Sequence, residues 1–172
     1  MNVLILQGSP RATGNTAWMA EEYRKAAEEA GHQVTVVDVS RKKIAGCLAC
    51  EYCHTKGGGV CVQKDDMQEL YPLLAEAEAL VLAAPIYYFT MSAQIQAAIQ
   101  RFYAIWKPAK VRKTALLLSS NSPAVYDGAI GEYRGITTFC GFEDTGIVTA
   151  KASEQKTDET RQKIAELVAK LG

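Results

Sequence analysis

The apolar positions of this chain form short strand-like runs that alternate with longer segments of helical spacing. The runs predict strands at residues 3–6, 34–39, 80–84, 114–118 and 147–150. Several of them are unbroken, which is typical of strands covered on both faces. Apolar residues three or four positions apart predict helices at about residues 17–30, 66–78, 93–107, 124–140 and 158–171. Strands and helices are therefore expected to alternate along the chain.

This alternation predicts an α/β protein with a three-layer, doubly wound, five-stranded parallel sheet. Each parallel connection needs a covering helix and crosses in the right-handed sense, which favours the strand order 2-1-3-4-5. Ligands of such sheets bind beyond the carboxyl ends of the strands, where the order reverses, here between the first and third strands. With 172 residues, of which 48% are hydrophobic, we expect one domain over residues 1–172, with segment 41–64 inserted after the second strand.

The segment after the first strand, residues 8–16, has the composition of an anion-binding loop. Its sequence is GSPRATGNT, and the helical pattern begins directly behind it. The first N–H groups of a helix have no intrahelical partner and carry a partial positive charge. Hydroxyl and amide donors, an arginine and two glycines would bring further donors close to a phosphate monoester. The alternative is a tight turn capped by Asn15 or Thr16, with Arg11 in water.

Two common nucleotide-binding loops do not match this segment. A P-loop has a lysine where this chain has Asn15, and a dinucleotide fingerprint needs G-x-G-x-x-G, which is absent here. We therefore expect a mononucleotide rather than ATP or a dinucleotide held in the usual Rossmann way.

The loop resembles the G-S-x-R…N-[ST] loop of the NADPH-dependent FMN reductase family, whose members have the flavodoxin-like fold. This resemblance implies that the FMN phosphate is held by Ser9, Arg11, Gly14, Asn15, Thr16 and Ala17.

A second motif follows the third predicted strand, where a proline precedes three consecutive aromatic residues. Aromatic side chains can supply the flat, partly apolar slot that a flavin ring needs. The segment is similar to the family's P-x-Y-[FW] loop, which implies ring contacts from Pro85, Ile86, Tyr87, Tyr88 and Phe89. Core packing is the alternative for any single one of these aromatic residues.

Four of the five cysteines lie within 15 residues, in the pattern C-x2-C-x2-C-x7-C. Close C-x2-C-x2-C spacing is typical of iron–sulfur sites, whereas structural zinc sites usually pair two separated knuckles. The pattern resembles the compact cysteine motif of the iron–sulfur flavoproteins, a branch of the same family. It implies a [4Fe–4S] cluster on Cys47, Cys50, Cys53 and Cys61. Plain thiols in a reductase without a cluster are the alternative.

Composition narrows the partners and the compartment. The chain has 19 lysines and arginines and 19 aspartates and glutamates. It therefore lacks the excess of positive charge that is typical of nucleic-acid-binding proteins. No signal-peptide pattern opens the chain, and no apolar run approaches the roughly 18 residues of a membrane span. We expect a cytoplasmic protein with neither nucleic acid nor membrane as a partner, in which cysteines are thiols or metal ligands.

Three functions remain after these observations. The first is an NAD(P)H-dependent reductase whose FMN takes electrons from NADH or NADPH and passes them to a small-molecule acceptor. It needs no catalytic side chain, because the cofactor carries the chemistry. The second is an iron–sulfur flavoprotein electron carrier with a ferredoxin-type partner. The third is a redox-inactive module for another phosphorylated ligand, against which the aromatic motif counts. The resemblance also implies a homodimer or homotetramer.

Overall fold

The centre of the molecule is a parallel sheet in the order β2-β1-β3-β5-β6. The computed structural model describes residues 1–172. The strands of this path are β1 (Asn2–Gln7), β2 (Gln33–Asp38), β3 (Ala79–Tyr87), β5 (Lys113–Ser120) and β6 (Glu143–Lys151). All neighbouring pairs on it are parallel. The predicted order 2-1-3-4-5 is confirmed, with β5 and β6 as the fourth and fifth predicted strands.

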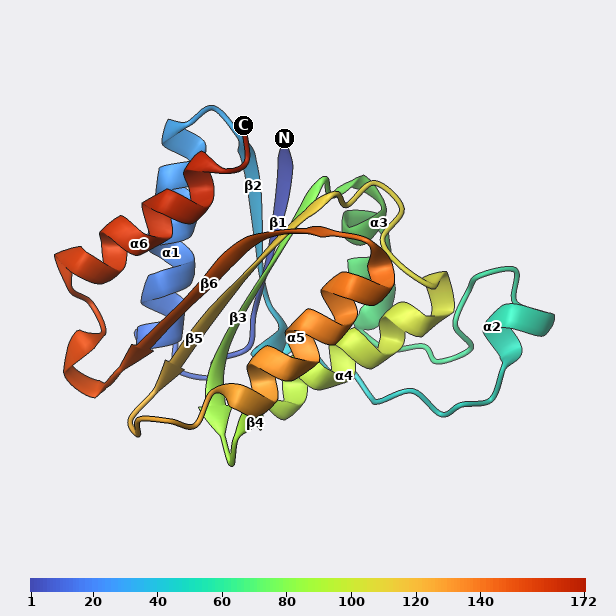
Figure 1. Cartoon of the computed structure of the whole chain (residues 1–172). Coiled ribbons are helices and arrows are strands. Elements are labelled where there is room, and N and C mark those ends of the chain that lie inside the picture. The colour runs from blue at the N-terminus through green and yellow to red at the C-terminus, as the bar shows by residue number, and fades with distance from the viewer.

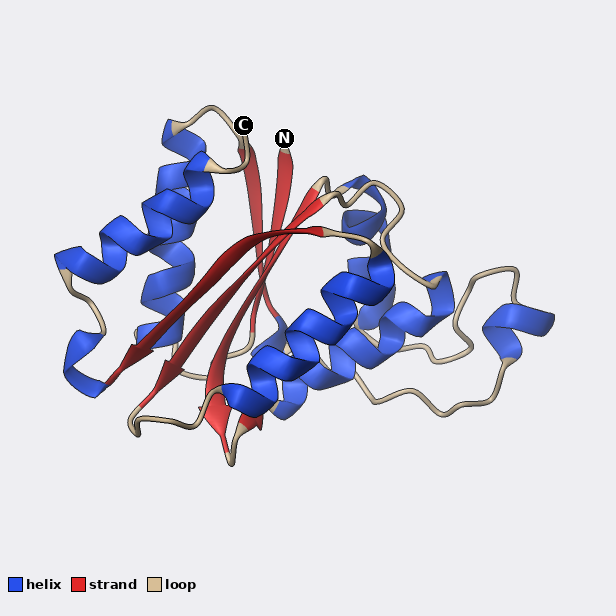
Figure 2. Cartoon of the chain, viewed as in Figure 1, coloured by secondary structure: helices blue, strands red, loops and turns tan.

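Helices cover both faces of the sheet, as Figure 1 and Figure 2 show. One face carries α1 (Asn15–Glu29) and α6 (Asp158–Ala169), and the other carries α3 (Met67–Glu76), α4 (Ala93–Arg101) and α5 (Asp127–Cys140). Short 3-10 helices span Val39–Arg41, Phe102–Ile105 and Ala152–Glu154. The small helix α2 (Tyr52–Thr55) lies in segment 41–64, which projects beyond α4. None of the helices combines the length and the apolar character needed to cross a bilayer.

Each face of the sheet has its own hydrophobic core. Val3 and Ile5 of β1 belong to the core under α1 and α6, whereas Leu4 and Leu6 belong to the core under α3, α4 and α5. Side chains alternate between the two faces of a strand. A strand covered on both faces must therefore be apolar at every position, which explains the unbroken run.

The third strand is longer than predicted and folds back on itself. It continues through Pro85 to Tyr87 and pairs there with the short antiparallel strand β4 (Thr90–Met91). Pro85 is tolerated because the carbonyl of Ala83 faces the β1 side, where it accepts from Gly8 N at 2.8 Å. Pro85, two residues later, faces the same side just beyond the end of β1, where a missing N–H costs no ladder bond.

Helix α4 ends earlier than the predicted boundary near residue 107. The chain passes from Arg101 into the 3-10 helix Phe102–Ile105, and the hydroxyl of Tyr71 donates to the carbonyl of Arg101 at 3.2 Å. Trp106 then has a φ of 60° and is 59% exposed, so the buried helical face predicted for residues 93–107 does not extend to it. Pro108 also disfavours helical backbone immediately before it.

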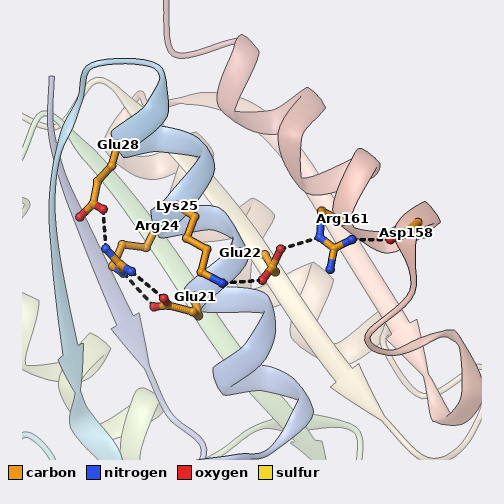
Figure 3. A network of polar contacts seen from close by, with 7 residues as sticks. All are labelled: Glu21, Glu22, Arg24, Lys25, Glu28, Asp158 and Arg161. Carbon is orange, nitrogen blue, oxygen red and sulfur yellow. Dashed lines mark hydrogen bonds and ion pairs between the residues drawn. The ribbon is translucent and has the colours of Figure 1, made fainter.

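Ion pairs join α6 to α1 on one face of the sheet (Figure 3). Arg161 Nε of α6 lies 2.6 Å from Glu22 Oε2 of α1, and Lys25 Nζ lies 3.2 Å from Glu22 Oε1. Burial by itself raises the pKa of Glu22, but hydrogen bonds from Arg161 and Lys25 outweigh it and hold this pKa below its ordinary value. The network therefore ties the two helices of this face together.

Candidate functional site

The loops that follow β1, β3 and β5 meet at the carboxyl edge of the sheet, around a pocket of about 70 Å³. These loops lie at the end of the sheet opposite the two chain termini (Figure 1). Of the predicted phosphate-binding residues, the pocket is lined by Ser9, Arg11, Gly14, Asn15 and Thr16. From the predicted ring-binding segment it is lined by Pro85, Ile86 and Tyr87. The two motifs found in the sequence thus share one site.

The start of the predicted phosphate-binding loop, residues 8–16, is fixed by contacts with α4. A side chain on Gly8 would place its Cβ 2.2 Å from Ile95 Cγ1 and 2.6 Å from Ser92 Oγ, so only glycine fits there. The hydroxyl of Ser92 donates to the carbonyl of Gly8 at 2.9 Å. Ser9 is buried, and its N–H donates to Gln7 Oε1 at 2.5 Å. These contacts fix the backbone at the start of the loop.

The N-terminus of α1 is open toward this pocket. Its N-cap residue is Gly14, no side chain caps the helix, and its first turn holds no acidic residue. A Cβ on Gly14 would lie 2.9 Å from Arg11 Cβ and 3.0 Å from the Arg11 carbonyl, so the loop closes tightly here. Free amides and the helix dipole favour an anion at such a position. Ala17 is helical but does not line the pocket, so only its backbone N–H can contribute.

Four further residues line the pocket that sequence reasoning did not assign. They are Ser119, Ser120, Asn121 and Gln155. The hydroxyls of Ser119 and Thr16 lie 2.6 Å apart, and Gln155 Nε2 donates to the carbonyl of Ser120 at 2.7 Å. Gln155 Oε1 is buried without a partner. The polar loop after the fourth predicted strand was a usable signal, because that strand ends at the same edge of the sheet. Nothing in the sequence marked Gln155.

The aromatic segment forms a hairpin rather than a simple loop. Tyr87 pairs with Thr90, and the two residues between them, Tyr88 and Phe89, have φ values of 51° and 70°. A two-residue turn with both φ angles positive matches the twist of a hairpin. Tyr88 is 96% exposed and Phe89 is 55% exposed, and neither lines the pocket. Tyr87 is therefore the aromatic residue of this segment that the chain itself brings to the site.

The residues around the pocket fit the phosphate end of FMN. Arg11 is the one charged side chain in the lining, and no ion pair in the structure occupies it. Hydroxyl, amide and backbone N–H donors surround the same space, and Gly14 leaves room for close approach. Pro85, Ile86 and Tyr87 supply the apolar side on which a flavin ring would lie.

The four clustered cysteines line a second, smaller cavity. Cys47, Cys50, Cys53 and Cys61 all border a space of about 20 Å³, which is room for a single water. None of the cysteines forms a disulfide, and Cys140 lies apart from this cavity. No three His, Cys, Asp or Glu side chains are arranged to hold one metal ion. The donor set suits a cluster, but the loop would have to open wider to hold one.

The cysteine segment is anchored on the chain that follows α4. His54 Nε2 lies 2.8 Å from the carbonyl of Tyr103, and the His54 ring lies 4.1 Å from the ring of Trp106. The hydroxyl of Tyr103 donates to both carboxylate oxygens of Glu51, at 2.9 and 3.2 Å. These contacts give His54 a packing role. They also explain why the exposed Trp106 lies outside the core.

Comparisons with known proteins identify the family of this chain. The model of the NADPH-dependent FMN reductase family matches residues 1–143. An iron-sulfur flavoprotein of Archaeoglobus fulgidus is 42% identical over 101 residues, which are 59% of this chain and 45% of that protein. This chain spans about half the length of the curated relatives it matches.

Solved structures show the same fold at low sequence identity. RosB with a bound intermediate, 8-demethyl-8-formylriboflavin-5'-phosphate, gives a TM-score of 0.78 at 17% identity, covering 98% of this chain and 76% of that one. An FMN-dependent NADH-azoreductase of Bacillus anthracis in complex with FMN gives a TM-score of 0.74 at 11% identity. The match covers 99% of this chain and 98% of that one. The fold is flavodoxin-like. With a family match over residues 1–143, this chain belongs to the NADPH-dependent FMN reductase family.

Proposed function

We propose that this protein is an FMN-binding oxidoreductase that takes electrons from NADH or NADPH and delivers them to a small-molecule acceptor. The observation that carries the proposal is the pocket at the carboxyl edge of the sheet. There an uncapped helix N-terminus, an unpaired arginine and the end of β3 lie together. Membership of the family and the FMN named with the azoreductase support the same cofactor.

The chain's own residues bind and orient the cofactor in this proposal. Arg11, the hydroxyls of Ser9 and Thr16, the Asn15 amide and the first N–H groups of α1, including that of Ala17, hold the phosphate. Pro85, Ile86 and Tyr87 bound the ring, and Gln155 holds the loop after β5 in place. FMN, when bound, supplies the redox chemistry, so no side chain acts as an acid or base. Tyr88 and Phe89 lie outside this pocket, and we assign them to an interface with a second chain.

Flavin titration followed by reduction tests the proposal. The full chain, stripped of flavin, is titrated with FMN and with riboflavin, and the bound flavin is then mixed anaerobically with NADH or NADPH. We expect FMN to bind at least about tenfold more tightly than riboflavin, because charge-assisted bonds to phosphate contribute about 1.5–3 kcal/mol each. Bleaching of the flavin band by either nicotinamide would support the reductase. Equal affinity for both flavins would contradict the phosphate site.

A second candidate function is that of an iron–sulfur flavoprotein, which exchanges single electrons with a ferredoxin-type partner. The observation that favours it is the single cavity lined by Cys47, Cys50, Cys53 and Cys61. The name of the Archaeoglobus fulgidus relative points the same way. These four thiolates would hold a [4Fe–4S] cluster after the loop opens, and the cluster would supply one-electron chemistry.

Iron and sulfide content after anaerobic reconstitution tests this second function. The native chain is compared with Cys50→Ser, and Cys140→Ser serves as the control because Cys140 lies outside the cavity. About four irons per chain in the native and control proteins and few in Cys50→Ser would support the cluster. No iron in any of the three would leave a plain FMN reductase.

The assembly we propose is a homodimer or homotetramer in the cytoplasm. The supporting observation is the group of exposed aromatic side chains at the tip of the β3–β4 hairpin, beside the pocket. Exposed apolar patches beside a binding site often mark an interface. Light scattering on the FMN-loaded chain gives the mass directly, and a monomer at micromolar concentration would contradict the assignment.

A further inference from the structure

Arg101 is the most deeply buried charged residue of the chain, and two of its three guanidinium nitrogens have no partner. It is 1% exposed. Its Nη1 lies 2.6 Å from Asp65 Oδ2 and donates to the carbonyl of Ala45 at 3.0 Å. Its Nε and Nη2 are buried and bond to nothing. Buried guanidinium N–H groups are normally satisfied, because each unsatisfied polar group costs free energy.

Arg101 lies beside the four clustered cysteines. It is the last residue of α4 and lines the cavity that the four clustered cysteines also line. Its two partners, Ala45 and Asp65, flank the cysteine segment on either side, so Nη1 holds together the two ends of the loop. A guanidinium stays protonated in proteins even when buried. A permanent positive charge with unused donors thus borders a cavity of thiols.

We propose that Arg101 is the positioning residue and counter-charge of the four-cysteine site. Its Nη1 holds the ends of the loop, and its Nε and Nη2 donate to sulfur atoms when the thiols are deprotonated around a cluster. This inference rests on the iron–sulfur function proposed above. Net charge and hydrogen bonds to sulfur set the potential of such clusters. Since each added electron makes the cluster more negative, a buried cation beside it raises the reduction potential.

A purely structural role makes a different prediction, which Asp65 distinguishes. If Arg101 only holds the loop in place, replacing either Arg101 or Asp65 breaks the same ion pair and should loosen the loop equally. If Arg101 acts as a counter-charge, removing Arg101 takes away a positive charge, whereas Asp65→Asn takes away a negative one. The two changes should then move the cluster potential in opposite directions.

The experiment uses the full chain reconstituted anaerobically with iron and sulfide, as native protein, Arg101→Gln, Arg101→Lys and Asp65→Asn. Arg112→Gln is the matched control, because Arg112 forms an exposed ion pair with Glu78 at the far end of β5. Iron and sulfide content, the midpoint potential of the cluster by electron paramagnetic resonance titration, and FMN affinity are measured on each sample. Thermal unfolding of the cluster-free chains shows which variants fold.

We expect Arg101→Gln to lower the cluster potential by about 59 mV or more, a tenfold change in the ratio of reduced to oxidised cluster for one electron. Arg101→Lys should have a potential between those of Arg101→Gln and the native chain, because lysine keeps the positive charge. Asp65→Asn should raise the potential, and the Arg112→Gln control should leave it unchanged. If Arg101→Gln does not fold, Asp65→Asn still gives a sign, because a lowered or unchanged potential in that variant would contradict the counter-charge role.

Cluster potentials that are unchanged in Arg101→Gln and Asp65→Asn, or shifted in the same direction, would overturn the counter-charge role. Loss of the cluster from both variants alike would also overturn it, because a purely structural role predicts that result. A native chain that binds no iron would overturn this inference together with the cluster. FMN affinity, measured in the same samples, separates that result from a failure of the flavoprotein proposal.

Discussion

Arg11 carries the only formal charge in the lining of the pocket at the carboxyl edge of the sheet, so in the proposed site it decides how strongly a phosphorylated ligand is preferred. Its neighbours can donate hydrogen bonds to many oxygens, but only the guanidinium adds a planar pair of donors with a fixed charge. The side chain is exposed and free of ion pairs in the structure, so binding a phosphate costs it no existing partner.

Arg11→Ala should weaken FMN binding about tenfold or more and leave riboflavin affinity nearly unchanged, because only FMN carries the phosphate. Fluorescence titration of the flavin-free chain measures both affinities. Arg112→Ala is the control, since Arg112 lies at the amino end of β5. Equal losses for both flavins would place Arg11 elsewhere in the site.

The two adjacent tyrosines of the aromatic segment differ in whether they line the pocket. Tyr87 lines the pocket, whereas Tyr88 points out at the hairpin tip and is 96% exposed. Tyr87→Ala should shift the spectrum of bound FMN and lower its affinity several-fold, and Tyr88→Ala should change the affinity only when the chain is assembled with a second copy. Absorption spectra and FMN titrations check both expectations, at protein concentrations above and below the one at which the assembly dissociates. A loss of cooperative unfolding in Tyr87→Ala would instead make it a core residue.

Among the elements, the β3–β4 hairpin depends on helix α5 for its position. A Cβ on Gly128, the second residue of α5, would lie 2.6 Å from the backbone carbonyl oxygen of Phe89. Backbone cannot move aside as a flexible side chain can, so the hairpin must shift if this glycine is replaced. The same helix carries Gly131 and Gly135, around which a Cβ would meet nothing within 4 Å. Of these three glycines, only Gly128 is therefore required by a close contact.

Gly128→Ala should displace the hairpin and weaken FMN binding several-fold, although alanine favours the helix. Gly131→Ala is the matched control and should stabilise the fold by about 0.5–1 kcal/mol without changing FMN affinity. Chemical denaturation and flavin titration of the two variants separate the effects. Identical behaviour of both would mean that the hairpin does not rest on α5.

At the scale of the whole molecule, the two helices on one face depend on each other through Glu22. The folded-state pKa of Glu22 is lowered, so its ion pairs with Arg161 and Lys25 stabilise the fold fully above the unfolded pKa of about 4.3. That stabilisation is lost as the pH falls through the folded-state value. Because Arg161 is half exposed to water, solvent screening keeps the contribution small.

Glu22→Gln should lower the free energy of unfolding by about 1 kcal/mol between pH 6 and 8, and the difference from the native chain should shrink below about pH 4.3. Denaturant titrations at a series of pH values measure it. Glu159→Gln removes an exposed pair with Lys163 within α6 and should have a much smaller effect. A difference that grew as the pH fell would contradict the assigned sign.

The sequence by itself determined the strands and their order, and it singled out the loop proposed to bind phosphate. Unbroken apolar runs report burial on both faces, and right-handed crossovers leave few possible orders, so local pattern suffices for these features. The loop was recognisable because its donors are contiguous, in residues 8–16. Pattern alone did not predict the strand β4 or the early end of α4, since both depend on where neighbouring elements stop.

Only the tertiary structure decided which residues line the two cavities. Thr16 and Ser119 are 103 positions apart, and the sheet brings their hydroxyls within 2.6 Å. Tyr87 and Tyr88 are adjacent in sequence, yet a turn with positive φ angles sends one to the pocket and the other to solvent. Arg101 looked like any polar residue of a helix, and its burial against the cysteine cavity follows from the packing of segment 41–64 on α4. Periodicity describes which residues are buried, but contacts between distant segments arise only when the elements pack together.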